Sequence, residues 1–459
     1  MYETTVLIVG AGPTGLTLAL DLARRRVPFR LIESAATPFP GSRGKGIQPR
    51  TLEIFDDLGV IDAILAAGAP YPKFRTHLGP FSLRAGSLGS IKQPTESVPY
   101  PNLWMVPQFR TEAVLREHLR VLGGEVEFGT ALATFTQNDH GVDATLATGE
   151  TVRADFLVGC DGGHSTVRKV LGLRMEGEAL DEKQNPWLVA DVEVEGLDRR
   201  DWHSWPFAKG GFIALCPLPS TSLFQLTAKA KTAAMGIESA VQKGTGHRVT
   251  RVAWSSIYQP AVRMVDRFRV GRAFLAGDAA HVHPPSGGQG LNTGVQDAYN
   301  LGWKLAHVAR GGPDSLLDTY EAERLPIAAA VLGLSKRLYR AKSIKRGDAT
   351  NQLALHYRTS PLSSGATLGS LHPGDRMPDG RLDDGSRLFD HLRGSHATEL
   401  VTQEGTRILI RPDGYIAHIG SQHFAEYAGE PTRQIAYKVP QAERASRNYS
   451  RNLPSKDSI

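Results

Sequence analysis

The chain has 459 residues, which is too long for one simple hydrophobic core and predicts two or three domains. Apolar residues make up 41% and charged residues 22%, as is typical of a globular protein. The formal net charge of +6 suits anionic ligands such as dinucleotides, but no dense Lys/Arg block indicates nucleic acid. Only Cys160 and Cys216 are present, without a CxxC pair, so a disulfide framework and a metal site are not expected. With no visible signal peptide or bilayer-length apolar stretch, we expect a cytoplasmic protein that does not enter the membrane.

The first elements predict a βαβ unit. A β-branched apolar run over residues 5–9 indicates a buried parallel strand, a glycine-rich turn follows, residues 16–26 have helical spacing, and residues 29–32 form a second strand. Farther along we expect helices over 51–65, 108–122, 294–309 and 315–339, and extended chain with turns over 68–101. We expect strands over 125–146 (a hairpin), 154–159, 188–194, 211–228, 251–258, 273–276, 407–410 and 415–419. Residues 443–459 are polar and predict a poorly ordered end.

The turn between the first strand and helix carries Gly10-x-Gly12-x-x-Gly15, and Glu33 closes the next strand. Gly10 permits a tight turn, Gly12 lets a pyrophosphate approach the backbone, and Gly15 allows close packing of helix and strand. The helix N-terminus then faces the phosphates, and Glu33 can accept hydrogen bonds from a ribose diol. The motif predicts dinucleotide binding without separating NAD from FAD.

Two further motifs follow predicted strands. Asp161-Gly162 comes after the strand at 154–159, which predicts a carboxylate at the ligand-binding edge of an open α/β sheet. Asp278 follows the strand at 273–276, where it can hold a ribitol or ribose hydroxyl. The next loop, from Pro284 and Pro285 to Gly288, is stiffened by proline and exposes backbone N–H groups. Such a loop can lie against an isoalloxazine ring and stabilise negative charge on it.

In this order, the three motifs resemble those of the group A FAD-dependent aromatic monooxygenases, the para-hydroxybenzoate hydroxylase fold family, and most closely its polyketide and phenol hydroxylase branch. The resemblance extends from Val6 to about Tyr339. It implies an α/β fold: a Rossmann-like FAD-binding domain, an inserted antiparallel-sheet substrate domain, and a small, shortened thioredoxin-like C-terminal region. We place the FAD-binding domain at residues 1–70, 102–175 and 265–345, the substrate domain at 71–101 and 176–264, and the C-terminal region at 370–459.

The resemblance also assigns residues to roles. It implies that FAD is bound by Gly10, Gly12, Gly15, Glu33, Arg43, Gln108, Asp161, Gly162, Asp278, Gly288, Gly290, Leu291 and Asn292. Among these, Arg43 is the expected pyrophosphate contact and Gln108 the contact on the flavin side of the nucleotide. No catalytic side chain is certain, and Pro284, Pro285 and Gly288 are the flavin-loop candidates. His281 and His283 flank this loop as expected neighbours of the flavin.

The implied reaction uses NADPH or NADH and O2 to hydroxylate a phenolic or polycyclic aromatic substrate through a flavin C4a-hydroperoxide. Such a mechanism needs orientation of the ring and exclusion of water more than a strong acid–base pair. The substrate-contact candidates on the predicted sheet are Trp205, Phe212 and Tyr258, and His203, Phe207 and Phe224 are further candidates by position. A homodimer is possible.

Other functions remain open at this point. An NAD-dependent dehydrogenase would account for the first motif but not for the Asp278 segment. A family member can also inactivate an antibiotic or act as a non-hydroxylating flavin oxidoreductase. A non-catalytic flavin-binding module would bind FAD without substrate-stimulated NAD(P)H oxidation.

Overall fold

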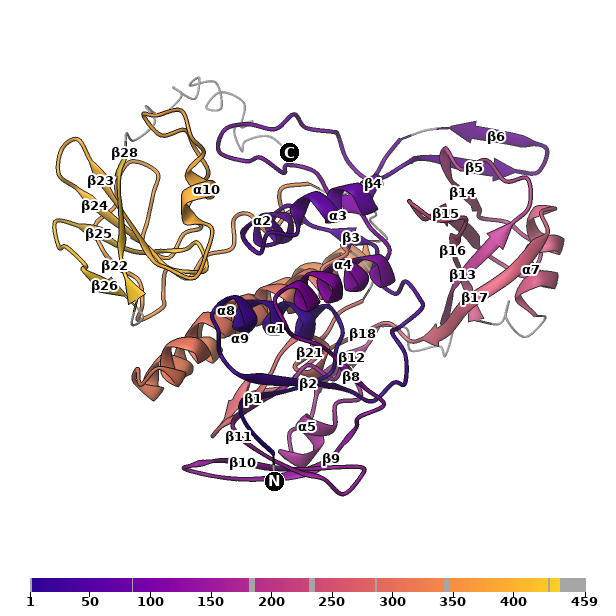
Figure 1. Cartoon of the computed structure of the whole chain (residues 1–459). Coiled ribbons are helices and arrows are strands. Elements are labelled where there is room, and N and C mark those ends of the chain that lie inside the picture. The colour runs from indigo at the N-terminus through magenta and orange to yellow at the C-terminus, as the bar shows by residue number, and fades with distance from the viewer. Residues whose placement is uncertain are drawn as a thin grey trace, which may run out of the picture.

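The computed structural model describes residues 2–84, 86–180, 186–230, 236–284, 287–341, 347–427 and 430–437. A central unit is built around a mainly parallel sheet, with a seven-stranded sheet on one side and a small C-terminal sheet on the other (Figure 1). Each of the three units has its own cluster of buried apolar residues. The expected α/β fold class is therefore confirmed, whereas the domain boundaries stay predictions.

The central sheet places five parallel strands side by side, in the order β20, β11, β1, β2, β8, and the first four of them end at the predicted cofactor motifs. Its path runs β19 (Arg269–Val270), β20 (Ala273–Leu275), β11 (Thr151–Gly159), β1 (Tyr2–Val9), β2 (Phe29–Glu33), β8 (Glu127–Phe128). The hairpin β9 (Leu132–Asn138) and β10 (Gly141–Leu146) joins it through the first half of β11. Because parallel strands end at one edge of a sheet, the loops that follow these four strands lie next to one another.

Helices pack against this sheet and against one another. They are α1 (Pro13–Arg24), α2 (Pro49–Asp57), α3 (Ile61–Ala67), α4 (Gln108–Val121), α5 (Thr166–Val170), α8 (Gly290–Ala309) and α9 (Asp318–Arg340). The single helix expected over 51–65 is two helices, because the chain turns at Gly59, whose φ is +76°. In the described part of the chain, no helix is long and apolar enough to cross a membrane.

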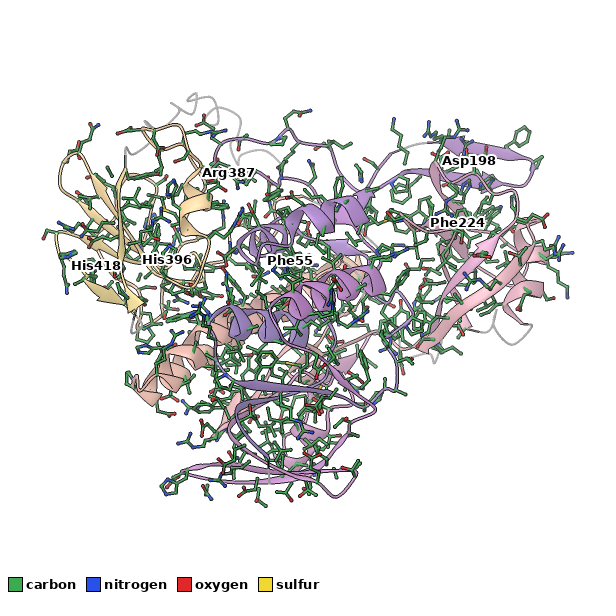
Figure 2. The ribbon with its side chains drawn as sticks, viewed as in Figure 1. Phe55, Asp198, Phe224, Arg387, His396 and His418 are labelled. Atoms are coloured by element: carbon green, nitrogen blue, oxygen red, sulfur yellow. The ribbon has the colours of Figure 1, made fainter. Side chains whose placement is uncertain are left out.

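The seven-stranded sheet has the order β17-β13-β16-β15-β14-β5-β6. Its strands are β5 (Lys73–Leu78), β6 (Phe81–Arg84), β13 (Trp187–Val194), β14 (Asp201–Trp205), β15 (Ile213–Pro217), β16 (Phe224–Lys229) and β17 (Val249–Tyr258). It is not purely antiparallel as expected, because the hairpin β5–β6, from a distant part of the chain, joins β14 in parallel. Helix α7 (Ile237–Thr245), which we did not predict, covers one face, where Phe224 lies in the core (Figure 2).

Smaller sheets connect the units. One contains β12 (Glu176–Ala179), β18 (Ala261–Met264) and β21 (His281–Val282), and another β3 (Gly46–Ile47), β7 (Trp104–Met105) and β4 (Ala69–Pro70). The C-terminal unit has α10 (Leu388–Leu392) and a mixed sheet of β22 (Ser364–Gly365), β25 (Ile416–Gly420), β24 (Arg407–Ile410), β23 (Thr398–Thr402) and β28 (Arg433–Tyr437). Arg387, just before α10, reaches Asp56 of α2 at 2.9 Å (Figure 2). The polar segment 443–459 lies outside the described residues.

Candidate FAD site and substrate face

The three glycines of the first turn have different surroundings. A Cβ on Gly10, whose φ is +102°, would lie 2.5 Å from the carbonyl oxygen of Cys160, and one on Gly15 would lie 1.9 Å from the carbonyl oxygen of Gly10. A Cβ on Gly12 would meet nothing within 4 Å. Gly10 and Gly15 therefore serve packing, whereas Gly12 leaves open space in front of α1, as an approaching diphosphate requires. FAD, whose two halves are joined by a diphosphate, fits this turn.

Glu33 lies at the same edge, at the end of β2. One carboxylate oxygen accepts a 2.9 Å hydrogen bond from the N–H of Ala11, inside the glycine turn. The other accepts a 2.9 Å bond from the N–H of Ala35. The hydroxyl of Ser34 also donates to this second oxygen, at 3.2 Å, so the oxygen bonded to Ala11 is the one with a lone pair left for a ribose hydroxyl beside the turn.

Asp161 follows β11 and is mainly bonded to the protein itself. Its Oδ2 accepts hydrogen bonds from the N–H groups of Thr166 at 2.7 Å and Val167 at 3.2 Å, at the start of α5. Its Oδ1 is buried without a hydrogen-bond partner in the described structure, and burial raises the pKa of this carboxyl. Gly162 has a φ of +73°, which glycine adopts readily. The structure shows Asp161 shaping the loop, and its contact with a cofactor stays a prediction.

Arg168 links this loop to the one that follows β20. Its guanidinium donates to the carbonyl of Gly163 at 2.9 Å and to that of Ala279 at 3.0 Å. Asp278, one residue before Ala279, is exposed at the strand edge. Surrounding protein raises the pKa of Asp278 by desolvation, and the nearby charges of His281 and Arg43 oppose this rise. The charge of Arg43 therefore acts on Asp278, although the two residues lie far apart in the sequence.

The loop before α8 is fastened to residues 46–48. Asn292 donates to the carbonyl oxygens of Gly46 and Gly288, each at 2.8 Å, and its Oδ1 accepts from the N–H of Gln48 at 2.8 Å. Asn292 is fully buried, so it orders the loop rather than facing solvent. The first flavin-loop candidate, Pro284, is buried, and the second, Pro285, lies outside the described residues.

Gly290 and Leu291 lie beside the other predicted cofactor residues. A Cβ on Gly290 would be 3.9 Å from Oδ1 of Asp278. A Cβ on Gly44 would be 3.2 Å from Leu291 and 3.8 Å from Oε1 of Gln108. The start of α8 therefore meets Asp278 and residues 41–46, which we call the Arg43 loop.

A buried chain of hydrogen bonds supports the loop that precedes α8, and sequence reasoning missed most of it. His283 and His281 are 3.0 Å apart through Nε2 and Nδ1, and Nε2 of His281 is 2.6 Å from Oδ2 of Asp297. Arg324 donates to Oδ1 of Asp297 at 2.7 Å and to the hydroxyl of Tyr357 at 3.0 Å. Burial alone would raise the pKa of Asp297, but His281 and Arg324 hold it below its usual value. The chain fixes the ring orientation of both histidines next to the flavin-loop candidates.

The Arg43 loop is held from two sides. The N–H of Gly44 donates to Oε1 of Gln108 at 3.1 Å. From the seven-stranded sheet, the side-chain amide of Gln225 donates to the carbonyl of Ser42. Arg43 itself is exposed, with its guanidinium carbon 5.8 Å from the ring centroid of Trp254. The positive charge therefore lies between the central sheet and the seven-stranded sheet, where a diphosphate can reach it.

One face of the seven-stranded sheet is turned toward this loop. Directly paired residues share a face, and the pairing defines three rows across the strands. The inner row is Trp254, Asp191, Gln225 and Cys216; the middle row is Ser256, Val189, Thr227 and Ala214; the outer row is Tyr258, Trp187, Lys229 and Phe212. The inner row meets the Arg43 loop, the middle row has small side chains, and the outer row is aromatic and cationic.

The substrate-contact candidates lie on both faces. Phe212 and Tyr258 are in the outer row, and the ring centroids of Phe212 and Trp187 are 6.0 Å apart. Trp205 lies on the opposite face, in the core under α7, where it is 8% exposed and stacks on His77 at 4.3 Å. Trp187 and Lys229, which sequence reasoning missed, are closer neighbours of Phe212 and Tyr258 than Trp205 is. Their place in the row depends on strand register, which the sequence alone does not reveal.

Asp191 in the inner row is the basis of a stability prediction. It is fully buried, neither of its oxygens accepts a hydrogen bond within the described residues, and burial raises its pKa to about 6 although Ser42 and Lys45 oppose the rise. A folded-state pKa above the unfolded value makes the ionised carboxylate destabilising, so stability falls as the pH rises from about 4 to about 6.

We therefore expect Asp191→Asn to raise the free energy of unfolding at pH 8 by about 2–3 kcal/mol. The gain should shrink as the pH is lowered toward about 4, where the wild-type carboxyl is protonated in both states. Urea unfolding at several pH values checks this. An Asn variant that is less stable than the wild type at pH 8 would contradict it.

The comparisons with known proteins agree with this geometry. Residues 3–335 match the family model described as FAD binding domain. A flavin-dependent monooxygenase of Mycobacteroides abscessus is 43% identical over 90% of this chain and 96% of its own length. The 6-methylpretetramide 4-monooxygenase of Streptomyces rimosus is 37% identical over 80% of this chain and 73% of its own. A crystal structure of aklavinone-11 hydroxylase with FAD and aklavinone superposes with a TM-score of 0.76 at 25% identity, covering 93% of this chain and 97% of that one.

A metal centre has no counterpart in the described ranges, where no group of three or more His, Cys, Asp or Glu side chains could hold an ion. The edge of the central sheet instead has an open glycine turn, two carboxylates and an arginine. The family match covers that edge and most of the chain. The chain therefore belongs to the FAD-binding monooxygenase family and is a flavin-dependent monooxygenase.

Proposed function

We propose that this monooxygenase uses NAD(P)H and O2 to hydroxylate a phenolic or polycyclic aromatic substrate. The observation that carries the proposal is the loop-facing face of the seven-stranded sheet, whose outer row joins three aromatic rings and a lysine. Two relatives point the same way, since one is named for acting on 6-methylpretetramide and the other was crystallised with aklavinone. Bound FAD supplies the electrons that activate O2.

The cofactor contacts follow from the strand ends. Gly12 and the N-terminus of α1 receive the diphosphate, with Gly10 and Gly15 shaping the turn, and Glu33 accepts from the adenosine ribose. Arg43 neutralises phosphate charge, Asp278 accepts from the ribitol chain, and Gln108 lies on the flavin side. Asp161 and Gly162 shape the neighbouring loop. Pro284, Gly288, Gly290, Leu291 and Asn292 form and order the surface for the isoalloxazine ring.

The outer row explains how a ring substrate can be held. The ammonium of Lys229 lies 3.9 Å from the ring centroid of Trp187, so this row presents both a flat apolar surface and a positive charge. Burial raises the pKa of Tyr258 above its usual value, so its hydroxyl stays protonated and can donate a hydrogen bond. A phenolate fits this row, because its planar ring can stack on the apolar surface and its oxyanion can accept from the ammonium of Lys229 and the hydroxyl of Tyr258. The small side chains of the middle row leave room for the reacting edge of the bound ring to reach the flavin loop.

NAD(P)H oxidation in air tests this function with a panel of simple phenols and polycyclic phenolic compounds. We expect at least one of them to stimulate oxidation and to leave as a hydroxylated product. NADH and NADPH are compared in parallel as the reductant. Flavin reduction that no ring compound stimulates would overturn the aromatic-hydroxylase proposal and favour a non-hydroxylating oxidoreductase.

A pair of variants tests the place of binding. Trp187→Ala removes the central ring of the outer row and should raise the KM for the stimulating compound about tenfold, the loss of a stacking contact worth about 1.4 kcal/mol. Phe207→Ala is the matched control, because Phe207 is 87% exposed and is not part of the row. Equal KM values for the two variants would remove the outer row from the substrate site.

A further inference from the structure

Glu112 is a buried carboxyl near the edge of the central sheet where FAD is proposed to bind. It has no role in the reaction proposed above. It lies on α4, is 2% exposed, and accepts one side-chain hydrogen bond, from Nε2 of Gln108 at 2.9 Å. The cation paired with it, Arg116, approaches only to 3.6 Å. This distance exceeds a hydrogen bond, so the carboxylate is poorly compensated for its loss of water.

The surroundings of Glu112 bring its pKa close to neutral pH. Burial raises its pKa to about 7, the bond from Gln108 and the charge of Arg116 oppose the rise, and the charge of Glu33 adds to it. Burial also lowers the pKa of Arg116, although the nearby Glu112 opposes this effect.

The other elements packed on α4 do not compensate Glu112. On α1, Asp21 is paired with Arg24 at 2.7 Å and with Arg25 at 3.1 Å. The acidic residue of α3, Asp62, is exposed. The charged groups that act on Glu112 are therefore Arg116 and Glu33, of which one attracts and one repels its negative charge.

Glu112 is connected to the cofactor edge through Gln108. The amide of Gln108 donates to Glu112 with its nitrogen and accepts from the N–H of Gly44 with its oxygen, at 3.1 Å. This fixed orientation ties α4 to the Arg43 loop. A dinucleotide bound at this edge brings negative charge and displaces water, and both effects favour the neutral form of a nearby carboxyl.

We propose that FAD binding is linked to the uptake of one proton by Glu112, which acts as a positioning residue for Gln108 and the Arg43 loop. The inference rests on the FAD site proposed above. The proton comes from solvent and converts the carboxylate of Glu112 to the acid, with no other bond made or broken. The carbonyl oxygen of the acid still accepts from Gln108, so the bond to Gly44 is kept while the buried negative charge is lost.

Because proton uptake is linked to FAD binding, the affinity for FAD should depend on pH in a defined direction. Below about pH 7 Glu112 is already protonated in the free protein, so the affinity for FAD does not depend on its titration. Above pH 7, Glu112 is ionised in the free protein and must take up a proton from solvent when FAD binds. The Kd for FAD should therefore rise by up to about tenfold per pH unit.

Calorimetric titration of FAD into the full-length chain, after removal of its flavin, tests the linkage. The same titration at pH 8 in phosphate and in Tris gives the number of protons taken up, because the two buffers release protons with different heats. We expect uptake approaching one proton for the wild type and close to none for Glu112→Gln, which keeps the shape without the charge. The control is Glu117→Gln on the same helix, whose partner Arg120 lies 2.8 Å away on the exposed surface; it should behave as the wild type.

The outcomes separate the inference from the site on which it rests. Equal proton uptake by the wild type and Glu112→Gln overturns the role of Glu112 while FAD binding stands. Loss of FAD binding by Glu112→Gln at every pH also overturns it, because the uncharged side chain should bind at least as tightly. A wild-type chain that takes up no FAD at all would instead remove the FAD site itself.

Discussion

Replacing Glu323 with alanine is expected to lower the free energy of unfolding by about 3–5 kcal/mol, because it removes the carboxylate paired with the buried ammonium of Lys304 and one of the two carboxylates paired with the buried guanidinium of Arg411. Glu323 of α9 is 3% exposed and accepts from both terminal nitrogens of Arg411, at 2.6 and 3.0 Å, and from Nζ of Lys304 at 2.8 Å. Burial alone would raise the pKa of Glu323, but Arg411 and Lys304 hold it well below its usual value. The carboxylate is therefore charged throughout the range in which the protein is handled.

The substitution should also weaken the contact between two units of the fold, because Arg411 belongs to the C-terminal unit and Glu323 to the central one. Urea unfolding at pH 8 measures it, with Glu404→Ala on an exposed turn of the C-terminal unit as the control. The control should change stability by less than about 0.5 kcal/mol. A loss below about 1 kcal/mol for Glu323→Ala would show that this buried network does not fasten the two units.

Gly12→Val is expected to remove FAD binding without unfolding the protein. The backbone of Gly12 has φ −72° and ψ −176°, which valine adopts without strain, and a Cβ there meets no protein atom within 4 Å. The new side chain occupies the space through which a diphosphate reaches α1. We expect the affinity for FAD to fall by about 100-fold or more, a loss of roughly 3 kcal/mol.

The neighbouring glycine gives the contrasting case. Gly15→Val would drive its Cβ into the carbonyl of Gly10, so we expect loss of folded protein rather than a folded protein without flavin. Flavin absorbance and the thermal midpoint of the flavin-free chain are measured for both variants. A Gly12→Val protein that binds FAD with wild-type affinity would contradict the placement of the diphosphate.

Much of the cofactor edge could be predicted from the sequence because its geometry is local. The predicted roles of Gly10, Gly12 and Gly15 follow from one strand, one turn and one helix, and in the structure Gly10 and Gly15 have close backbone contacts while Gly12 faces open space. Glu33 ends one strand and Asp278 follows another, and the buried apolar runs of both strands are evident in the sequence, so both residues are expected at the same edge of the parallel sheet.

The remaining parts depend on contacts between distant segments. Asp297 and Arg324 lie on helices, where single charged residues are usually solvent-exposed, and only the packing of α8 against α9 buries them together with His281. Trp205 and Tyr258 could not be assigned to a face of the sheet, because a shift of one residue in register turns a side chain to the other side. The burial of Glu112 has no signal in the sequence, because it follows from the packing of α4 against α1 and α3.

The most direct test of the account is the fate of oxygen in the product. The purified enzyme, loaded with FAD, is incubated under ¹⁸O2 with NADH or NADPH and the ring compound that most stimulates oxidation, and the product is analysed by mass spectrometry. An aromatic hydroxylase must place one atom of ¹⁸O on the ring of the product. A ring product that carries oxygen from water, or hydrogen peroxide as the sole oxygen product, would contradict the proposed hydroxylation.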